Sequence, residues 1–195
     1  MTTRIVLGGI IGGIVLFMWG AIAWMALPLY SAQFKVLPNE DVVRAALREG
    51  VTEPGLFAVP GFDYSKQRQQ SDHEAQLNAW SQKHREGPLA VVIARPQGEE
   101  PMAAVVFLRG FALQVLVAVI AAWLLSRAGA SLTSYGTRVQ FVTVLGFLAS
   151  LVIDGAYWNW FYFPTSYTVT ALADHTIGWL LAGLAMAAIV KPKTA

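Results

Sequence analysis

The sequence predicts an integral membrane protein, mainly α-helical: a four-transmembrane-helix bundle with a small α+β extracytoplasmic domain between the first and second helices. Its 195 residues are 55% hydrophobic and 13% charged, with a mean hydropathy of +0.50, which is more apolar than an ordinary soluble domain. The apolar residues form four long runs, and a helix needs about 20 such residues to cross a bilayer. Most of the acidic residues, ten of the twelve, lie in one polar segment, 31–102.

The first apolar run, Ile5–Leu29, holds 25 residues without a charge. A cleavable signal peptide has an apolar core of only about 7–15 residues, so we expect a retained transmembrane helix within residues 1–30. Glycines four apart near its start leave a flat strip against which another helix can pack closely, although glycine is also simply common in membrane helices. We expect the strip to contact another helix, of this chain or of a partner. The strip consists of Gly8, Gly9, Gly12 and Gly13.

The polar segment 31–102 differs in kind, with eight Lys or Arg, ten Asp or Glu and six prolines. Capping, turn and alternation signals predict helix, strand, helix and strand in that order, which makes a small α+β domain. A domain of about 70 residues is near the size at which a lone core is marginal, so we expect it to rely on the membrane helices or on a partner. The expected elements are 40–49, 56–59, 71–85 and 89–95.

Three further spans are expected in residues 103–195: Ala103–Ser126, Val139–Phe163 and Ala171–Val190, with a polar turn at 164–170. The third run ends in aromatic residues, and Trp and Tyr gather where hydrocarbon meets the lipid headgroups. The outer end of this helix is therefore predicted to carry an interfacial aromatic belt. The belt consists of Tyr157, Trp158, Trp160 and Tyr162.

The basic residues predict the orientation. The N-terminus, the 127–138 linker and the C-terminal tail carry basic residues and no acidic residue, which is typical of cytoplasmic segments. Both termini are therefore expected in the cytoplasm, and the polar domain outside it. For a bacterial source the membrane would be the inner membrane and the domain periplasmic. The residues concerned are Arg4, Arg127, Arg138, Lys191 and Lys193.

Arg109 in the second span and Asp154 in the third carry opposite charges and are expected at matched depths of about 9–13 Å below the outer boundary. The plain interpretation is a structural ion pair between these helices. Two alternatives stay open: separate snorkelling of Arg109 to the interface, and a proton or ion path through the pair.

Other chemistry receives little support from the sequence. There is no cysteine, and His175 is the one histidine in or near a span, so a bis-histidine haem is not expected. His175 could ligate a chlorin pigment or join a carboxylate metal site, but the simpler interpretation is an interfacial residue at a helix start, next to Asp174 as a first-turn acid. We predict no cofactor and no metal. Hydrolase, P-loop and dinucleotide motifs are missing, and no extended basic patch indicates nucleic acid.

The leading functional hypothesis is a non-catalytic accessory or assembly subunit of a larger membrane protein complex, with respiratory and photosynthetic complexes as candidates. Its expected partners are the lipid bilayer and other membrane protein subunits. One alternative is a small transporter or channel that uses Arg109 and Asp154. Another is a membrane-embedded hydrolase, in which Asp154, Asp174 and His175 converge on the outer face.

Overall fold

The computed structural model describes residues 2–27, 29–63, 73–128 and 132–191. The chain divides into two compact units, which we call the helical unit (Met1–Lys35 and Glu100–Ala195) and the polar unit (Val36–Glu99). The protein is mostly helical, at 71%, with a small two-stranded sheet. Four of its helices are long and apolar enough to cross a membrane. The sequence-based expectation of a mainly helical protein with four helices of this length and hydropathy is thus confirmed.

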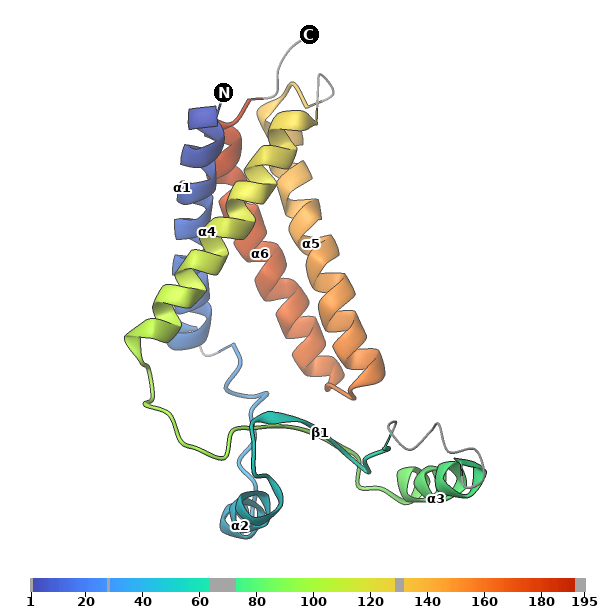
Figure 1. Cartoon of the computed structure of the whole chain (residues 1–195). Coiled ribbons are helices and arrows are strands. Elements are labelled where there is room, and N and C mark those ends of the chain that lie inside the picture. Colours follow the sequence, from blue (N-terminus) through green and yellow to red (C-terminus); the bar gives the residue numbers. More distant parts are fainter. Residues whose placement is uncertain (1, 28, 64–72, 129–131, 192–195) are drawn as a thin grey trace. The chain divides into compact units, whose positions relative to one another are not determined.

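The helical unit holds the four long helices (Figure 1). The first continues from regular α-helix into a short π-helix before it ends. Each helix covers most of the corresponding apolar run, and the largest differences from the expected boundaries lie at the starts of the last two helices. The bounds are α1 Thr2–Ala21 with η1 Ile22–Ala26, α4 Ala104–Arg127, α5 Tyr135–Trp160 and α6 Thr165–Ile189.

The polar turn expected at 164–170 is wrong. Pro164 is instead the N-cap of α6, and the helix begins at Thr165. The polar residues of this stretch fit a helix because their side chains find hydrogen-bond partners: the Thr168 hydroxyl donates to the Pro164 carbonyl at 3.4 Å, and Ser166 and Thr170 bond to Gln33. Asp174 and His175 therefore lie nine and ten residues into α6, about 14 Å from its start at 1.5 Å per residue. The expectation that they sit in the first turn is also wrong.

Helix α1 packs against both α4 and α6, and α5 packs against α6, whereas α4 and α5 contact each other only slightly (Figure 1). The neighbour order across the unit is therefore α4, α1, α6, α5. The core lies toward the end at which α1 begins and α6 ends. Small residues of α4 (Ala118, Ala121, Ala122) meet larger buried side chains there: Leu16, Leu125, Val142, Met186 and Val190.

The polar unit contains α2 (Glu40–Gly50), β1 (Gly55–Val59), α3 (His73–Glu86) and β2 (Ala90–Ala94). The strands pair antiparallel, with Gly55 opposite Ala94 and Val59 opposite Ala90. The predicted order of helix, strand, helix and strand is confirmed. Residues 71 and 72, where the second of these helices was expected to begin, lie outside the described part of the chain.

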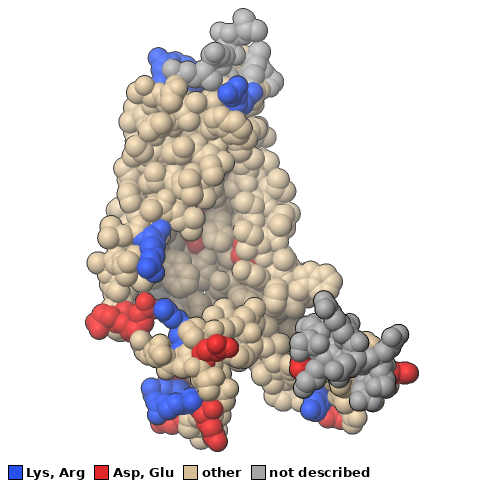
Figure 2. All heavy atoms as spheres, in the orientation of Figure 1, with Lys and Arg blue, Asp and Glu red and all other residues tan. Residues whose placement is uncertain are grey.

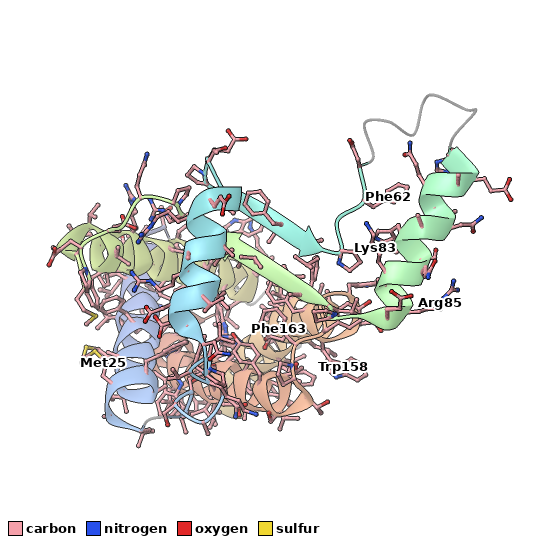
Figure 3. All side chains as sticks on the ribbon, turned by 90° about the horizontal axis from the view of Figure 1, so that it is seen from below. Met25, Phe62, Lys83, Arg85, Trp158 and Phe163 are labelled. Carbon is pink, nitrogen blue, oxygen red and sulfur yellow. The ribbon has the colours of Figure 1, made fainter. Side chains whose placement is uncertain are left out.

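The polar unit has almost no core of its own. Val51 is the one buried side chain among its described residues, and α2 and α3 contribute none. Trp80 of α3 packs outside the helix: its ring meets Phe62 edge-on, and its Nε1 donates to the Pro60 carbonyl at 3.2 Å. Phe62 accordingly lies beside α3 in Figure 3. Val42 of α2 remains 70% exposed and Ile93 of β2 81% exposed.

Candidate functional site

Asp154 of α5 is 5% exposed and belongs to a three-residue cluster between α5 and α6. Ser150 lies one turn earlier on α5, and its hydroxyl donates to Oδ2 of Asp154 at 2.5 Å. Nδ1 of His175 on α6 lies 3.1 Å from the same Oδ2 and 2.9 Å from the Ser150 Oγ. The cluster therefore joins the two helices through polar groups that would otherwise face hydrocarbon.

Asp174 of α6 is also 5% exposed and has a separate set of donors. Nε1 of Trp19 in α1 donates to Oδ1 at 2.7 Å and to the Asp174 carbonyl at 3.1 Å. The hydroxyl of Tyr30, just beyond η1, donates to Oδ2 at 2.8 Å. Burial raises the pKa of Tyr30, and the hydrogen bond to the Asp174 carboxyl raises it further. This cluster links α6 to α1, as the Asp154 cluster links it to α5.

Aromatic rings surround Tyr30 at this end of the helical unit. Trp24 stacks on it with ring centroids 4.2 Å apart, and Tyr167 meets it at 5.8 Å. Figure 2 shows a hollow in the same unit with acidic atoms on its floor. Asp154 and Asp174 are the only acidic residues in the sequences of α1, α4, α5 and α6.

The Ser150, Asp154 and His175 cluster also lines a pocket of about 170 Å³ between α5 and α6. A nucleophilic triad needs the serine on one imidazole nitrogen and the carboxylate on the other. Here both approach Nδ1, so the histidine cannot take the serine proton while the carboxylate holds its other nitrogen. The geometry lets Asp154 and His175 share a proton but does not activate Ser150 as a nucleophile.

The structure does not bring Arg109 to Asp154. Arg109 is exposed on α4, and no ion pair joins the two residues, both of which are described. His175 forms an ion pair with Asp154 when the imidazole is protonated. The reason lies in the neighbour order: α4 packs on α1 and only slightly meets α5, so matched depth does not make these helices adjacent.

Two of the predicted strip glycines, Gly9 and Gly13, lie against α4. A Cβ atom added at Gly9 would stand 2.5 Å from the Cα of Val119, and one at Gly13 would stand 2.5 Å from the Cα of Val115. Both distances are shorter than any ordinary carbon contact, so the two helix backbones approach each other only because these positions lack side chains.

The other two, Gly8 and Gly12, lie against α6. An added Cβ would meet Cγ2 of Val190 at 2.5 Å and Cγ of Met186 at 2.8 Å, respectively. The four glycines therefore form two adjacent strips on α1, one for each neighbouring helix. This double use explains how α1 can take the central place between α4 and α6.

The predicted aromatic belt occupies the end of α5 and the residues that follow. All four of its side chains are exposed, from 43% for Tyr157 to 72% for Trp160. Nε1 of Trp158 donates to the Thr165 hydroxyl at 3.1 Å and so braces the turn into α6. Figure 3 shows Trp158 and Phe163 at this end of the helical unit.

Sequence reasoning missed Ser150, Trp19 and Tyr30 as partners of the two carboxylates. Ser150 was within reach of such reasoning, because a residue four positions before Asp154 shares its helix face. Trp19 and Tyr30 carried no comparable signal, since they are separated from Asp174 by 155 and 144 residues. Only the neighbour order of the helices reveals them.

Comparison with known proteins gives no relative: no family model, curated protein or solved structure matches the chain. Among the described residues, no group of three His, Asp or Glu side chains is placed to hold a metal ion. The function must therefore be argued from the geometry of the two units alone.

Proposed function

We propose that this multi-pass membrane protein is a non-catalytic accessory or assembly subunit of a larger membrane protein complex. The observation that carries the proposal is the missing core of the polar unit, in which Val51 is the one buried described residue. Burial of apolar surface is the main favourable term in folding, so a unit that buries so little needs a further surface for stability. A partner subunit in contact with the apolar face of α2 would supply it. This face consists of Val42, Val43, Ala46 and Leu47.

The use of the intramembrane polar groups supports a structural role. Asp154 is bonded to Ser150 and His175, and Asp174 is bonded to Trp19 and Tyr30. Each set joins neighbouring parts of the helical unit, and such hydrogen bonds in membranes are worth about 0.6–2 kcal/mol. The hydrogen bonds between helices therefore account for the presence of these polar groups without a catalytic role.

The orientation proposed with this role places both termini in the cytoplasm and the polar unit outside it. Where α1 begins, Figure 2 shows basic groups and no acidic group. Arg4 in α1, Arg127 at the end of α4 and Lys191 after α6 supply positive charge next to the spans, as the positive-inside rule requires. Arg138 is instead buried within α5, and Lys193 lies outside the described residues.

Site-specific photocrosslinking in native membranes tests the proposal. A photoreactive residue at Val42, on the apolar face of α2, should form an adduct with a separate polypeptide. The same residue at Asn78, an exposed polar position of α3, is the matched control and should form little adduct. Adducts of Val42 confined to lipid or to the chain itself would contradict the accessory role.

A small transporter is the second candidate, favoured by the state of Asp174. This carboxyl is 5% exposed within a span, and its described hydrogen-bond partners are neutral donors rather than a cation. Ionisable groups in such places often bind protons or ions in transit. Asp174→Asn should then abolish a proton flux measured in proteoliposomes, whereas Glu99→Gln in the polar unit should not. If proteoliposomes with the unaltered protein showed no more proton flux than protein-free vesicles, the transporter candidate would be excluded.

A further inference from the structure

We propose that the helical unit binds one anionic phospholipid, with an acyl chain between α1 and α4 and the phosphate at Arg109. This goes beyond the accessory role and does not depend on it. The first observation is a pocket of about 620 Å³, within the range of about 300–1,000 Å³ that is usual for ligand sites. It is lined by residues of α1, α4 and the segments next to them.

The pocket has the lining that a hydrocarbon chain requires. Phe17, Trp24, Met25 and Phe107 are among its walls, and Gln114 is its one polar side chain. Flexible methionine and flat aromatic side chains adapt well to an irregular apolar guest. Figure 3 shows Met25, one of the lining residues, in η1 at the end of the first helix.

Two glycines create the space. A Cβ atom at Gly20 would meet nothing within 4 Å, and one at Gly110 would meet only the Phe17 ring, at 3.9 Å. Nearer the start of α1, by contrast, the space beside Gly9 and Gly13 is occupied by backbone atoms of α4. The same helix pair is therefore tightly packed at one end and open at the other.

A cation neighbours the pocket residues on the surface of α4, although it is not itself part of the lining. Arg109 immediately precedes Gly110 and lies three residues after Val106, both of which line the pocket. It is exposed and forms no ion pair with any described acidic residue. It lies five residues into α4, about 7.5 Å below its first residue, from where a long side chain reaches the headgroup layer. An anionic phosphate complements this charge, and guanidinium binds phosphate through paired hydrogen bonds.

Native mass spectrometry of the purified full chain tests the proposal, with phosphatidylglycerol as the anionic probe and phosphatidylcholine as the zwitterionic one. The chain should retain one phosphatidylglycerol in preference. Arg109→Gln should weaken that binding about tenfold, which corresponds to about 1.4 kcal/mol, and leave phosphatidylcholine binding unchanged. Arg127→Gln, at the other end of the same helix, removes the same charge and should have no such effect.

Filling the pocket gives the second arm. Gly20→Leu should reduce the binding of both lipids, because it occupies the space of the chain and leaves Arg109 intact. Gly110→Ala, a smaller change, should act in the same direction and serves if the leucine variant fails to fold by circular dichroism. Equal retention of the two lipids, equal effects at Arg109 and Arg127, or unchanged binding in the folded pocket variant would each overturn the proposal.

Discussion

A methyl group added at Gly13 should destabilise the helical unit, whereas the same methyl at Gly20 of the same helix should not. The Cβ of Gly13→Ala would lie 2.5 Å from the Cα of Val115 and 2.8 Å from its backbone nitrogen. Backbone atoms cannot turn aside as a side chain can, so α1 and α4 would have to separate. At Gly20 no atom lies within 4 Å of the added group.

The magnitude follows from two terms. Alanine removes the conformational cost of glycine at both positions, about 0.5–1 kcal/mol, and this term cancels when the two variants are compared. Overpacking a closely packed interface costs about 1–3 kcal/mol. Gly13→Ala should therefore unfold with a free energy about 1–3 kcal/mol lower than that of Gly20→Ala. Gly12→Ala should fall between them, because the atoms that it meets belong to the flexible Met186 side chain.

Reversible unfolding in mixed detergent micelles, followed by circular dichroism at a helix band, measures these differences. Gly20→Ala should unfold at a slightly higher denaturant fraction than the parent chain, because it loses only the conformational cost of glycine, and Gly13→Ala should unfold at a clearly lower fraction than Gly20→Ala. If Gly13→Ala were at least as stable as the parent chain, the close approach of α1 and α4 would be refuted. If both variants were destabilised equally, Gly20 would be covered as closely as Gly13.

Three further results are expected. In this chain without cysteines, Gln76→Cys should react with an impermeant thiol reagent added outside intact cells and Thr133→Cys should not; the reverse pattern would invert the orientation. Because burial and its carboxyl partner raise the pKa of Tyr30, the stability that this group contributes is complete below pH 10 and should decline above it; a Tyr30→Phe variant with the same alkaline decline would contradict this. Arg138→Gln should cost about 1.5–3 kcal/mol in the same unfolding assay, because the guanidinium donates to the Ala187 carbonyl near the end of α6 at 3.2 Å; unchanged stability would show that this contact is dispensable.

The four spans could be predicted because membrane crossing depends on local composition, and each run carries its own signal. The start of α6 could not. Thr165, Ser166 and Thr170 look like a turn in the sequence, but in the structure their side chains bond to residues outside α6. The Thr165 hydroxyl accepts from Trp158 of α5, and Gln33 accepts from Ser166 and donates to Thr170. A polar stretch at a helix start is ambiguous until its partners are known.

For the candidate site, the sequence predicted how deep each residue lies along its span but not which residues it contacts. Position along a span gives how far Asp154 lies from the boundary, but not which helix stands beside it. The sequence-based pairing with Arg109 assumed that consecutive spans α4 and α5 are packed together along their length. The glycines of α1 create another order, since they draw α4 and α6 onto α1 and leave α4 and α5 barely in contact.

This order makes α6 the helix on which both carboxyl clusters depend. Asp174 hydrogen bonds to α1, and the adjacent His175 contacts Asp154 of α5. Two consecutive residues of α6 therefore contact two different neighbouring helices. Successive residues of a helix point about 100° apart, which is the separation that two flanking helices need. An insertion of one residue before Asp174 would turn both groups away from their partners at once. The polar groups therefore fix the rotation of α6 about its axis, which apolar packing against Ala, Gly and Val alone would define less sharply.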